Sequence, residues 1–179
     1  MKEALLIVDM SYDFVADDGG LTVGKPAQEI VPYIIEQANK MLQAGNAVVV
    51  TMDAHRPDDE HFRSWPKHNI VGTPGQELYG PLKDWYNENR MNPNVQYFPK
   101  ADYNAFFNTG LAEWLKVNQV KRVHITGVCT DICCFLTAAG ANAEGFATVV
   151  HARGCATFTQ NHKTFLDQMQ LCFKSEIIQ

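Results

Sequence analysis

The sequence predicts an α/β protein: a three-layer, doubly wound (Rossmann-like) sheet of about six mainly parallel strands with helices on both faces. Two observations lead to this fold. Short, uninterrupted apolar runs are typical of strands buried on both faces, and segments with helical spacing lie between them, as the crossovers of a parallel sheet require. The chain has 179 residues, 46% of them hydrophobic, which suffices for one core. We therefore expect a single domain over residues 1–179.

Four apolar runs are predicted to form strands, because each is rich in aliphatic and β-branched side chains. They cover residues 4–8, 47–52, 123–126 and 147–150, and a further strand is expected to end near residues 95–98. The segments with helical spacing are residues 27–43, 110–118, 130–143 and 160–173. Pro26 suits the first turn of the first helix, and Gly45 suits its end. Residues 57–99 collect many of the Pro and Gly residues, and we interpret them as long functional loops.

Three segments with reactive side chains directly follow predicted strands. Asp9 follows the run at 4–8, Asp53 follows the run at 47–52, and residues 127–133 follow the run at 123–126. In a parallel sheet, ligands bind beyond the carboxyl ends of the strands. We therefore expect these segments to meet at one edge of the sheet and to form the functional site.

Composition and charge exclude several classes of protein. The formal net charge of −5 argues against a nucleic-acid-binding surface, which needs clustered Lys and Arg. The apolar run at residues 4–8 is too short for a signal peptide or a membrane span. Five cysteines without a CxxC pair argue against a structural zinc site, and a disulfide framework is not expected in a reducing cytosol. We expect a cytoplasmic protein.

Three of the six histidines lie in residues 52–69, MDAHRPDDEHFRSWPKHN. Asp53 and His55 are two residues apart and point the same way on an extended chain, while His61 and His68 can fold back from the loop. A carboxylate with imidazoles can bind zinc, iron or manganese. An ordinary polar surface loop fits the spacing equally well. The acidic residues between the histidines are interpreted as solvated charges: Asp58, Asp59 and Glu60.

Three of the five cysteines lie in residues 124–135, HITGVCTDICCF. Thr130 is a suitable N-cap, so Cys133 is expected near a helix N-terminus, where the helix dipole lowers the pKa of a thiol. Cys134 is turned by about 100° from Cys133 and is assigned to the core. Cys129 lies in the turn, where its backbone N–H matters more than its sulfur. The two remaining cysteines are expected to be buried: Cys155 and Cys172.

A cysteine nucleophile needs a base and a positive group, and two charged residues at predicted strand ends are candidates. Asp9 ends an otherwise apolar strand, where an unpaired carboxylate would be costly. Lys100 follows the strand that ends near residues 95–98. A structural ion pair is the alternative interpretation of either residue.

Taken together, these residues resemble the nicotinamidase (pyrazinamidase) branch of the isochorismatase-like cysteine hydrolase superfamily. The resemblance rests on Asp9 in LLIVDMSYDF, Lys100 in FPKADY and Cys133 in GVCTDIC, in the family's order. It implies a catalytic triad of these three residues, with Cys133 as the nucleophile. It also implies a cis peptide between Val128 and Cys129, and an oxyanion hole formed by the backbone N–H groups of Cys129 and Cys133.

The same resemblance implies a metal site and an aromatic pocket. The implied ligands of one divalent metal ion, zinc in preference to iron or manganese, are Asp53, His55, His61 and His68. The loop ligand varies between His and Glu in the family, so Glu60 remains an alternative to His61. The implied substrate-binding residues are Phe14, Trp65 and Tyr103. The chain departs from the family pattern at Ser11, where Gln is frequent, and at Asn69, where Cys is frequent.

The implied function is hydrolysis of nicotinamide, and of pyrazinamide, to the acid and ammonia through a cysteine thioester, in NAD salvage. The alternative is another C–N hydrolase of the superfamily that acts on a ureido or carbamoyl substrate. Cys133 disfavours an ether hydrolase, and the absence of a GxGxxG or Walker loop after the first strand disfavours a nucleotide-binding module. The expected partner is a small pyridine carboxamide, without nucleic acid or membrane, and both a monomer and a homo-oligomer remain open.

Overall fold

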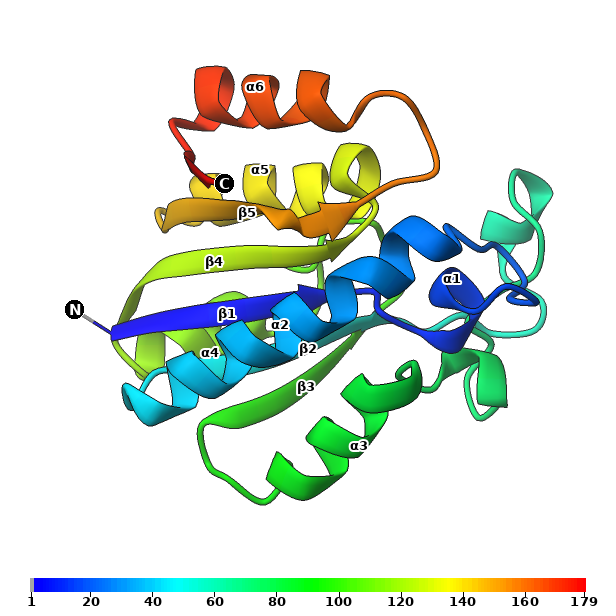
Figure 1. Ribbon diagram of the computed structural model, residues 1–179, viewed down its shortest axis with the longest axis horizontal. Helices are drawn as coiled ribbons and strands as arrows, with labels where there is room; N and C mark the ends of the chain where they lie inside the picture. The colour runs from blue at the N-terminus through cyan, green and yellow to red at the C-terminus, as the bar shows by residue number, and fades with distance from the viewer. Residues whose placement is uncertain (1) are drawn as a thin grey trace.

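Six strands form one parallel sheet in the computed structural model, which describes residues 2–179 (Figure 1). The strand order is β3-β2-β1-β4-β5-β6, and every neighbouring pair is parallel. The strands are β1 (Lys2–Val8), β2 (Ala47–Asp53), β3 (Val95–Lys100), β4 (Val120–Val128), β5 (Ala147–Ala156) and β6 (Glu176–Ile178). The predicted doubly wound fold is confirmed.

β1 lies in the middle of the sheet because it is apolar on both faces. Residues 4–8 are 0% exposed. The register places Ile7 beside Val50 of β2 and beside Thr126 of β4. Complete burial of each large aliphatic side chain contributes about 1.5–3 kcal/mol, so this run makes β1 the shared neighbour of β2 and β4.

Helices cover both faces of the sheet, with α2 in front of it and α4 behind it in Figure 1. One face carries α1 (Tyr12–Val15), α2 (Lys25–Gln43) and α3 (Gly80–Asn89). The other face carries α4 (Leu111–Val117), α5 (Phe135–Ala143) and α6 (His162–Phe173). The short helical segments are η1 (Glu60–Arg63), η2 (Pro74–Gln76) and the π-helix η3 (Thr130–Cys134). No helix within residues 2–179 combines the length and the apolar character that a membrane crossing requires.

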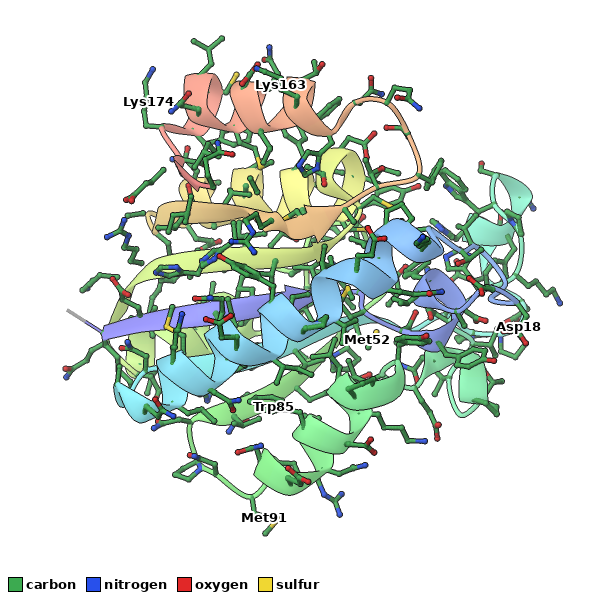
Figure 2. The ribbon with its side chains drawn as sticks, viewed as in Figure 1. Asp18, Met52, Trp85, Met91, Lys163 and Lys174 are labelled. Atoms are coloured by element: carbon green, nitrogen blue, oxygen red, sulfur yellow. The ribbon has the colours of Figure 1, made fainter. Side chains whose placement is uncertain are left out.

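The longest helix, α2, shows how the sequence pattern produces this packing. Pro26 lies in the first turn, where its missing N–H is not needed. Ile30, Ile34 and Ala38 recur every four residues and form the buried face of the helix. Figure 2 shows the side chains that fill the space around the sheet, among them the buried Met52 and Trp85.

The structure corrects the interpretation of residues 57–99, which are not all loop. α3 lies within this range, and β3 begins at Val95. The buried residues of α3 are Leu82 and Trp85, and two apolar positions give too weak a periodicity to predict a helix. The sequence pattern also misses β6, because a strand of three residues is too short for a pattern.

Two smaller expectations are wrong. Thr130 is not the N-cap, because η3 already begins at this residue with Cys129 as its N-cap, and Thr130 Oγ1 is instead hydrogen-bonded to His162 Nδ1 (2.8 Å). Cys172 is exposed, whereas Cys134 and Cys155 are buried as expected. The interpretation of Cys172 fails because residue type alone does not show which face of α6 meets solvent.

Candidate active site

The carboxyl edge of the sheet brings an acid, an amine and a thiol together from three distant segments. Asp9 directly follows β1, Lys100 ends β3, and Cys133 lies in η3 after β4. Lys100 Nζ is 2.7 Å from Asp9 Oδ2 and 3.9 Å from Cys133 Sγ. The exposed fractions are 0% for Asp9, 3% for Lys100 and 6% for Cys133. The three residues of the predicted triad are therefore neighbours in one buried corner.

Lys100 is surrounded by oxygen atoms that keep it charged. Its ammonium group donates to Asp53 Oδ1 (2.6 Å) and to the carbonyl oxygen of Asp102 (2.9 Å). Burial opposes the charge, but the carboxylates of Asp9 and Asp53, together with the Cys133 sulfur, outweigh burial and raise the pKa of Lys100. Burial also acts against the Asp53 carboxylate, but Lys100 and the neighbouring histidines prevail and lower the pKa of Asp53.

Asp9 has the properties of a general base. Burial raises the pKa of Asp9, Lys100 lowers it and Asp53 raises it, with a result of about 6. At neutral pH the carboxylate is thus ionised but more basic than an exposed Asp. Its Oδ1 accepts the backbone N–H of Asp53 (2.8 Å). Its backbone is left-handed (φ 55°), a conformation that Asp tolerates, and turns the chain out of β1.

The Cys133 thiol does not have the lowered pKa that its place in the helix predicts. Burial raises the pKa of Cys133 well above its ordinary value, Lys100 opposes this, and Asp9 and Asp53 add to it. The prediction is wrong because burial and the two carboxylates together raise the pKa more than Lys100 lowers it. The proton therefore rests on sulfur, which lies in hydrogen-bonding contact with Asp9.

The turn before Cys133 lies at the same corner and carries the two predicted oxyanion-hole residues, Cys129 and Cys133. The Val128–Cys129 peptide is cis, as the resemblance implies. The first N–H groups of a helix have no carbonyl partner within it, and both Cys129 and Cys133 line the cavity described below. Burial raises the pKa of the Cys129 thiol to about 12, and this thiol contacts Thr157 and Phe158, whereas Lys100 lies beside Cys133. Gly127 (φ 111°) must be glycine, because an added Cβ would lie 2.0 Å from the Val8 carbonyl oxygen.

Three histidines converge beside this corner. The side-chain nitrogens of His55, His61 and His68 lie within 4.8 Å of one another, and we call these residues the loop histidines. His55 and His61 stack with ring centroids 4.4 Å apart. Asp53 borders the group, with its Oδ2 3.4 Å from His55 Nε2 and 3.7 Å from His68 Nε2. Asp53 thus connects the loop histidines to Lys100, which contacts its other oxygen.

Hydrogen bonds on the outer side of the rings show that the residues fit a metal ion. His55 Nδ1 donates to Asp59 Oδ2 (3.0 Å), and His68 Nδ1 donates to the Pro66 carbonyl oxygen (2.6 Å). Each Nε2 therefore presents a lone pair to the centre of the group. His55 Nε2 is buried without a hydrogen-bond partner and faces an oxygen of Asp53. When the rings are neutral, their lone pairs and this carboxylate oxygen converge on one point that a cation would satisfy, and this donor set suits zinc, iron or manganese.

The three acidic residues of this loop have different environments. Asp58 and Glu60 form exposed ion pairs with nearby arginines, as solvated charges do. Asp59 is not a solvated charge, contrary to prediction: besides its contact with His55, its Oδ1 accepts the backbone N–H of His61 (2.9 Å). His61 lies inside the group of histidines, and Glu60 points away from it.

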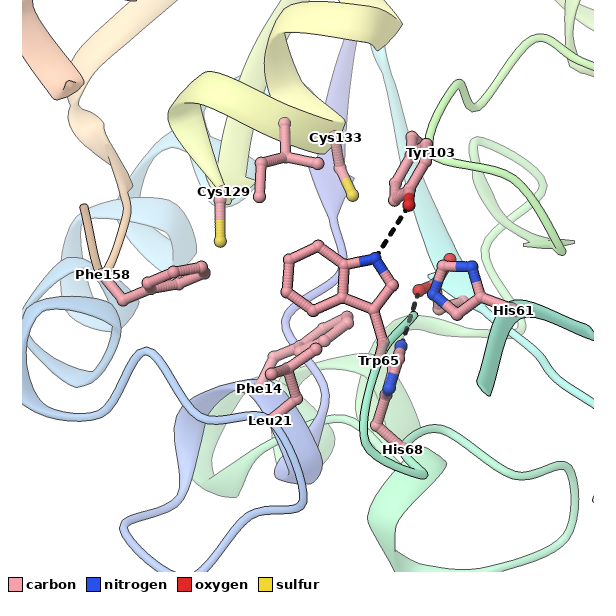
Figure 3. Close-up of a pocket in the computed structure, with 11 residues that line it drawn as sticks. Phe14, Leu21, His61, Trp65, His68, Tyr103, Cys129, Cys133 and Phe158 are labelled. Atoms are coloured by element: carbon pink, nitrogen blue, oxygen red, sulfur yellow. Dashed lines mark hydrogen bonds and ion pairs between the residues drawn. The ribbon is translucent and has the colours of Figure 1, made fainter. Parts of the chain in front are cut away.

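An aromatic cavity separates Cys133 from the loop histidines (Figure 3). The space between its lining residues is about 390 Å³, including the part open to solvent. All three predicted substrate residues line it: Phe14, Trp65 and Tyr103. The Trp65 indole N–H donates to the Tyr103 hydroxyl (2.9 Å), so these two side chains fix each other.

Three apolar lining residues are not identified from the sequence: Leu21, Ile132 and Phe158. Ile132 and Phe158 come shortly after β4 and β5, so the rule that ligands bind beyond the carboxyl ends of strands would have found them. Leu21 comes from the connection between α1 and α2, where no pattern in the sequence indicates a site.

Asp13 joins the loops that surround the cavity. Its Oδ2 accepts the backbone N–H of Asn69 (2.7 Å), and its Oδ1 accepts that of Gly20 (3.1 Å). An added Cβ at Gly75 would lie 2.2 Å from Asp13 Oδ2. Of the two departures from the family pattern, Ser11 has a structural role, because its side chain caps α1, which carries Asp13. Asn69 contacts Asp13 through its backbone only, and its left-handed backbone (φ 47°) is a conformation that Asn tolerates.

Comparison with known proteins agrees with this geometry. The isochorismatase domain family matches residues 3–178, nearly the whole chain. The chain belongs to the isochorismatase family. The PncA protein of Bacillus subtilis, an isochorismatase family protein, is 41% identical over 163 residues, 89% of each chain. The structure of nicotinamidase/pyrazinamidase PncA from Bacillus subtilis matches with a TM-score of 0.96 and 36% identity over 100% of both chains.

Two further structures share the fold of this isochorismatase family member at lower sequence identity. The pyrazinamidase of Pyrococcus horikoshii in complex with zinc has a TM-score of 0.89 and 30% identity, over 100% of this chain and 99% of that one. The N-carbamoylsarcosine amidase of Thermoplasma acidophilum has a TM-score of 0.86 and 26% identity, over 100% and 96%. The resemblance inferred from the sequence is confirmed, and with it the assignment to the hydrolases.

Proposed function

We propose that the protein is a nicotinamidase, which hydrolyses nicotinamide, and also pyrazinamide, to the acid and ammonia in NAD salvage. The observation that carries this proposal is an aromatic cavity with Cys133 in one wall and two of the loop histidines, His61 and His68, in another. The relatives whose names state nicotinamidase or pyrazinamidase activity, at 36% and 30% identity, support it.

The reaction begins at the buried corner. Asp9 takes the thiol proton of Cys133, and the sulfur attacks the carboxamide carbon, so that an S–C bond forms and the carbonyl electrons move to oxygen. Lys100 touches both groups and stabilises the negative charge as it moves from carboxylate to sulfur. Because burial raises the pKa of the Cys133 thiol, the sulfur keeps its proton until Asp9 removes it.

The backbone N–H groups of Cys129 and Cys133 would receive the oxyanion of the tetrahedral intermediate. Loss of one donor from such a site typically costs about 3–4 kcal/mol of transition-state stabilisation. When the C–N bond breaks, Asp9 returns the proton to the departing nitrogen and ammonia leaves a thioester on Cys133. Asp9 then activates a water molecule that attacks the thioester carbon, which releases the acid and restores the thiol.

The proposed cofactor is one divalent metal ion, zinc in preference to iron or manganese, held by Asp53, His55, His61 and His68. When bound, the ion would supply a Lewis acid that coordinates the ring nitrogen of the substrate. The chain's own residues complete the recognition: Phe14 and Trp65 provide apolar surfaces for a flat ring, and Tyr103 is held in place by the Trp65 indole.

A ureido or carbamoyl substrate fits the site less well. Such a substrate has no aromatic ring and no ring nitrogen, so the aromatic walls and the loop histidines would have no role in binding it. The proposed location is the cytoplasm, because all five cysteines are free and thiols persist in a reducing compartment.

The test is ammonia release from nicotinamide by the purified protein, with its metal content measured. Cys133→Ala should lower kcat by a factor of about 10⁴ or more and leave the metal content unchanged. Cys172→Ala, a change at an exposed cysteine outside the cavity, is the matched control and should keep full activity. Benzamide, which lacks the ring nitrogen, should be a poor substrate. Turnover of N-carbamoyl amino acids without turnover of nicotinamide would reject the proposal.

A further inference from the structure

The loop after β5 places a half-exposed phenylalanine in the wall of the cavity. Phe158 lines the cavity although its side chain is 47% exposed. In Figure 3 its ring lies on the side of the cavity opposite His61 and Tyr103. Core packing does not hold a ring that is exposed to this extent on a loop, so its position depends on the backbone on either side of it.

Asp131 binds both residues that flank Phe158. Thr157 Oγ1 donates to Asp131 Oδ1 (2.6 Å), and Thr159 Oγ1 donates to Asp131 Oδ2 (2.5 Å). Each oxygen of one carboxylate therefore accepts a hydroxyl group from one side of Phe158. Hydrogen bonds to an ionised group are roughly twice as strong as neutral ones, so this pair of contacts fixes the loop. We call it the Asp131 clamp.

The Asp131 clamp connects the loop to the turn that carries the nucleophile. Asp131 lies in η3, two residues before Cys133. The Cys129 thiol makes further contacts with the Thr157 side chain and with the backbone N–H of Phe158. These contacts thus fix the Phe158 ring relative to η3, the same short helix that positions the attacking sulfur.

We propose that Phe158 is a specificity-determining residue that contacts the aromatic ring of the amide substrate, and that Asp131 is its positioning residue. This inference rests on the proposed function. A pyridine carboxamide with its carbonyl carbon at Cys133 and its ring nitrogen toward the loop histidines turns ring carbons 4 and 5 toward Phe158. Phe158 therefore limits the size of substituents at these carbons, and the Asp131 clamp maintains that limit.

Steady-state kinetics of two variants test the role of Phe158. Phe158→Ala should raise KM for nicotinamide about 3- to 10-fold, the loss expected for one aromatic contact, with kcat changed by less than about 3-fold. It should also reduce the preference for nicotinamide over 5-methylnicotinamide about 10-fold, because the wall is removed. Phe107→Ala, at an equally large side chain that is 55% exposed and does not line the cavity, is the matched control.

The Asp131 clamp is tested at a residue that does not line the cavity. Thr159→Val removes the hydroxyl but keeps the shape, and should reproduce the KM and the relaxed preference of Phe158→Ala. Thr159→Ser keeps the hydroxyl and should rescue both. Asp131→Asn should resemble Thr159→Val, and in the Phe158→Ala background it should raise KM no further, because the ring it positions is absent. If Asp131→Asn does not fold, the Thr159 pair still decides the question.

A second measurement separates this inference from the proposed function. The rate at which N-phenylmaleimide modifies Cys133, followed by mass spectrometry of the peptide, needs no turnover. Phe158→Ala and Thr159→Val should increase this rate several-fold, and Thr159→Ser should not. Absence of nicotinamide turnover in the wild-type protein would reject the proposed function. Unchanged labelling rates, or a wild-type KM in Phe158→Ala, would reject this inference.

Discussion

The three loop histidines differ from a pair of histidines under α2 in what their ring nitrogens contact. This pair consists of His124 on β4 and His151 on β5, and we call it the sheet histidines. His124 Nδ1 lies 2.9 Å from His151 Nε2, and the outer nitrogens meet the Tyr33 hydroxyl (2.8 Å) and Glu3 Oε2 (3.2 Å). One assignment of protons satisfies all four nitrogens with both rings neutral.

The comparison teaches that burial alone does not distinguish a ligand from a structural histidine. His151 is 3% exposed and His55 is 1% exposed. The difference lies in the inner nitrogen, which has a donor partner in the sheet histidines and faces a carboxylate oxygen in the loop histidines. A chain of complete hydrogen bonds stabilises the fold, whereas converging lone pairs create a place for a cation.

Removal of a loop histidine should have the largest effect. His61→Ala should lower the affinity for zinc by at least about 100-fold, because one of the converging nitrogens is lost. His151→Gln should leave zinc affinity unchanged. The measurement is competition with a chromogenic chelator on metal-free protein, and equal losses in the two variants would remove the distinction between the groups.

The sheet histidines should make stability depend on pH. Burial, and then the charge of His124, lowers the pKa of His151 to about 4, against 6.5 in an unfolded chain. Above pH 6.5 the His151 imidazole is neutral in both the folded and the unfolded chain, and its hydrogen bonds contribute fully to the free energy of unfolding. As the pH falls toward 4, only the unfolded chain takes up the proton, so the free energy of unfolding should decrease by up to about 3 kcal/mol.

Urea unfolding at pH 7 and at pH 4.5 measures this dependence. The carboxylates of the protein also titrate in this range, so His151→Gln is needed as the reference. The variant should lose less stability between the two pH values than the wild-type protein does. A decrease of the same size in both proteins would show that His151 takes no part in it.

Asp59 offers a sharper test of what orients a loop histidine. Asp59→Asn should lower zinc affinity about 10- to 100-fold, because the carboxylate that holds the proton on His55 Nδ1 is lost. Asp58→Asn changes the neighbouring acid, which contacts only a surface arginine, and should have no effect. Isothermal titration with zinc distinguishes the two, and similar losses would indicate an effect of net charge.

The smallest effect is expected at the end of the sheet-histidine chain. Tyr33→Phe removes the hydroxyl that meets His151 Nδ1. The loss should cost about 1 kcal/mol of unfolding free energy, read from chemical denaturation, without any change in zinc affinity. A change in zinc affinity would mean that the two groups are coupled through the sheet.

The sequence predicted the fold well where local chemistry decides structure. The short apolar run at residues 4–8 is typical of an interior strand, and the place of Asp9 at its end follows from that. α3 was not predicted because its buried face consists of only Leu82 and Trp85, and their contribution to stability depends on the neighbours they pack against.

The site could be predicted as a set of residues but not as a set of environments. From the sequence, Asp58 and Asp59 are both predicted to be solvated charges. Only the turn into η1, which Asp59 caps, gives them different environments. The pKa of Cys133 likewise depends on two carboxylates that are remote in sequence. The contact of Phe158 with the cavity likewise follows from hydrogen bonds between the loop after β5 and η3, which join segments remote in sequence.

The contacts of Asp13 have a consequence for how related sequences can diverge. One carboxylate fills the space beside Gly75 and holds the backbones of residues 20 and 69, so three loops share a single anchor. A side chain introduced at position 75 would displace that anchor and move the neighbours of His68 with it. Substitutions in these loops should therefore be inherited together, and position 13 should change only in company with position 75.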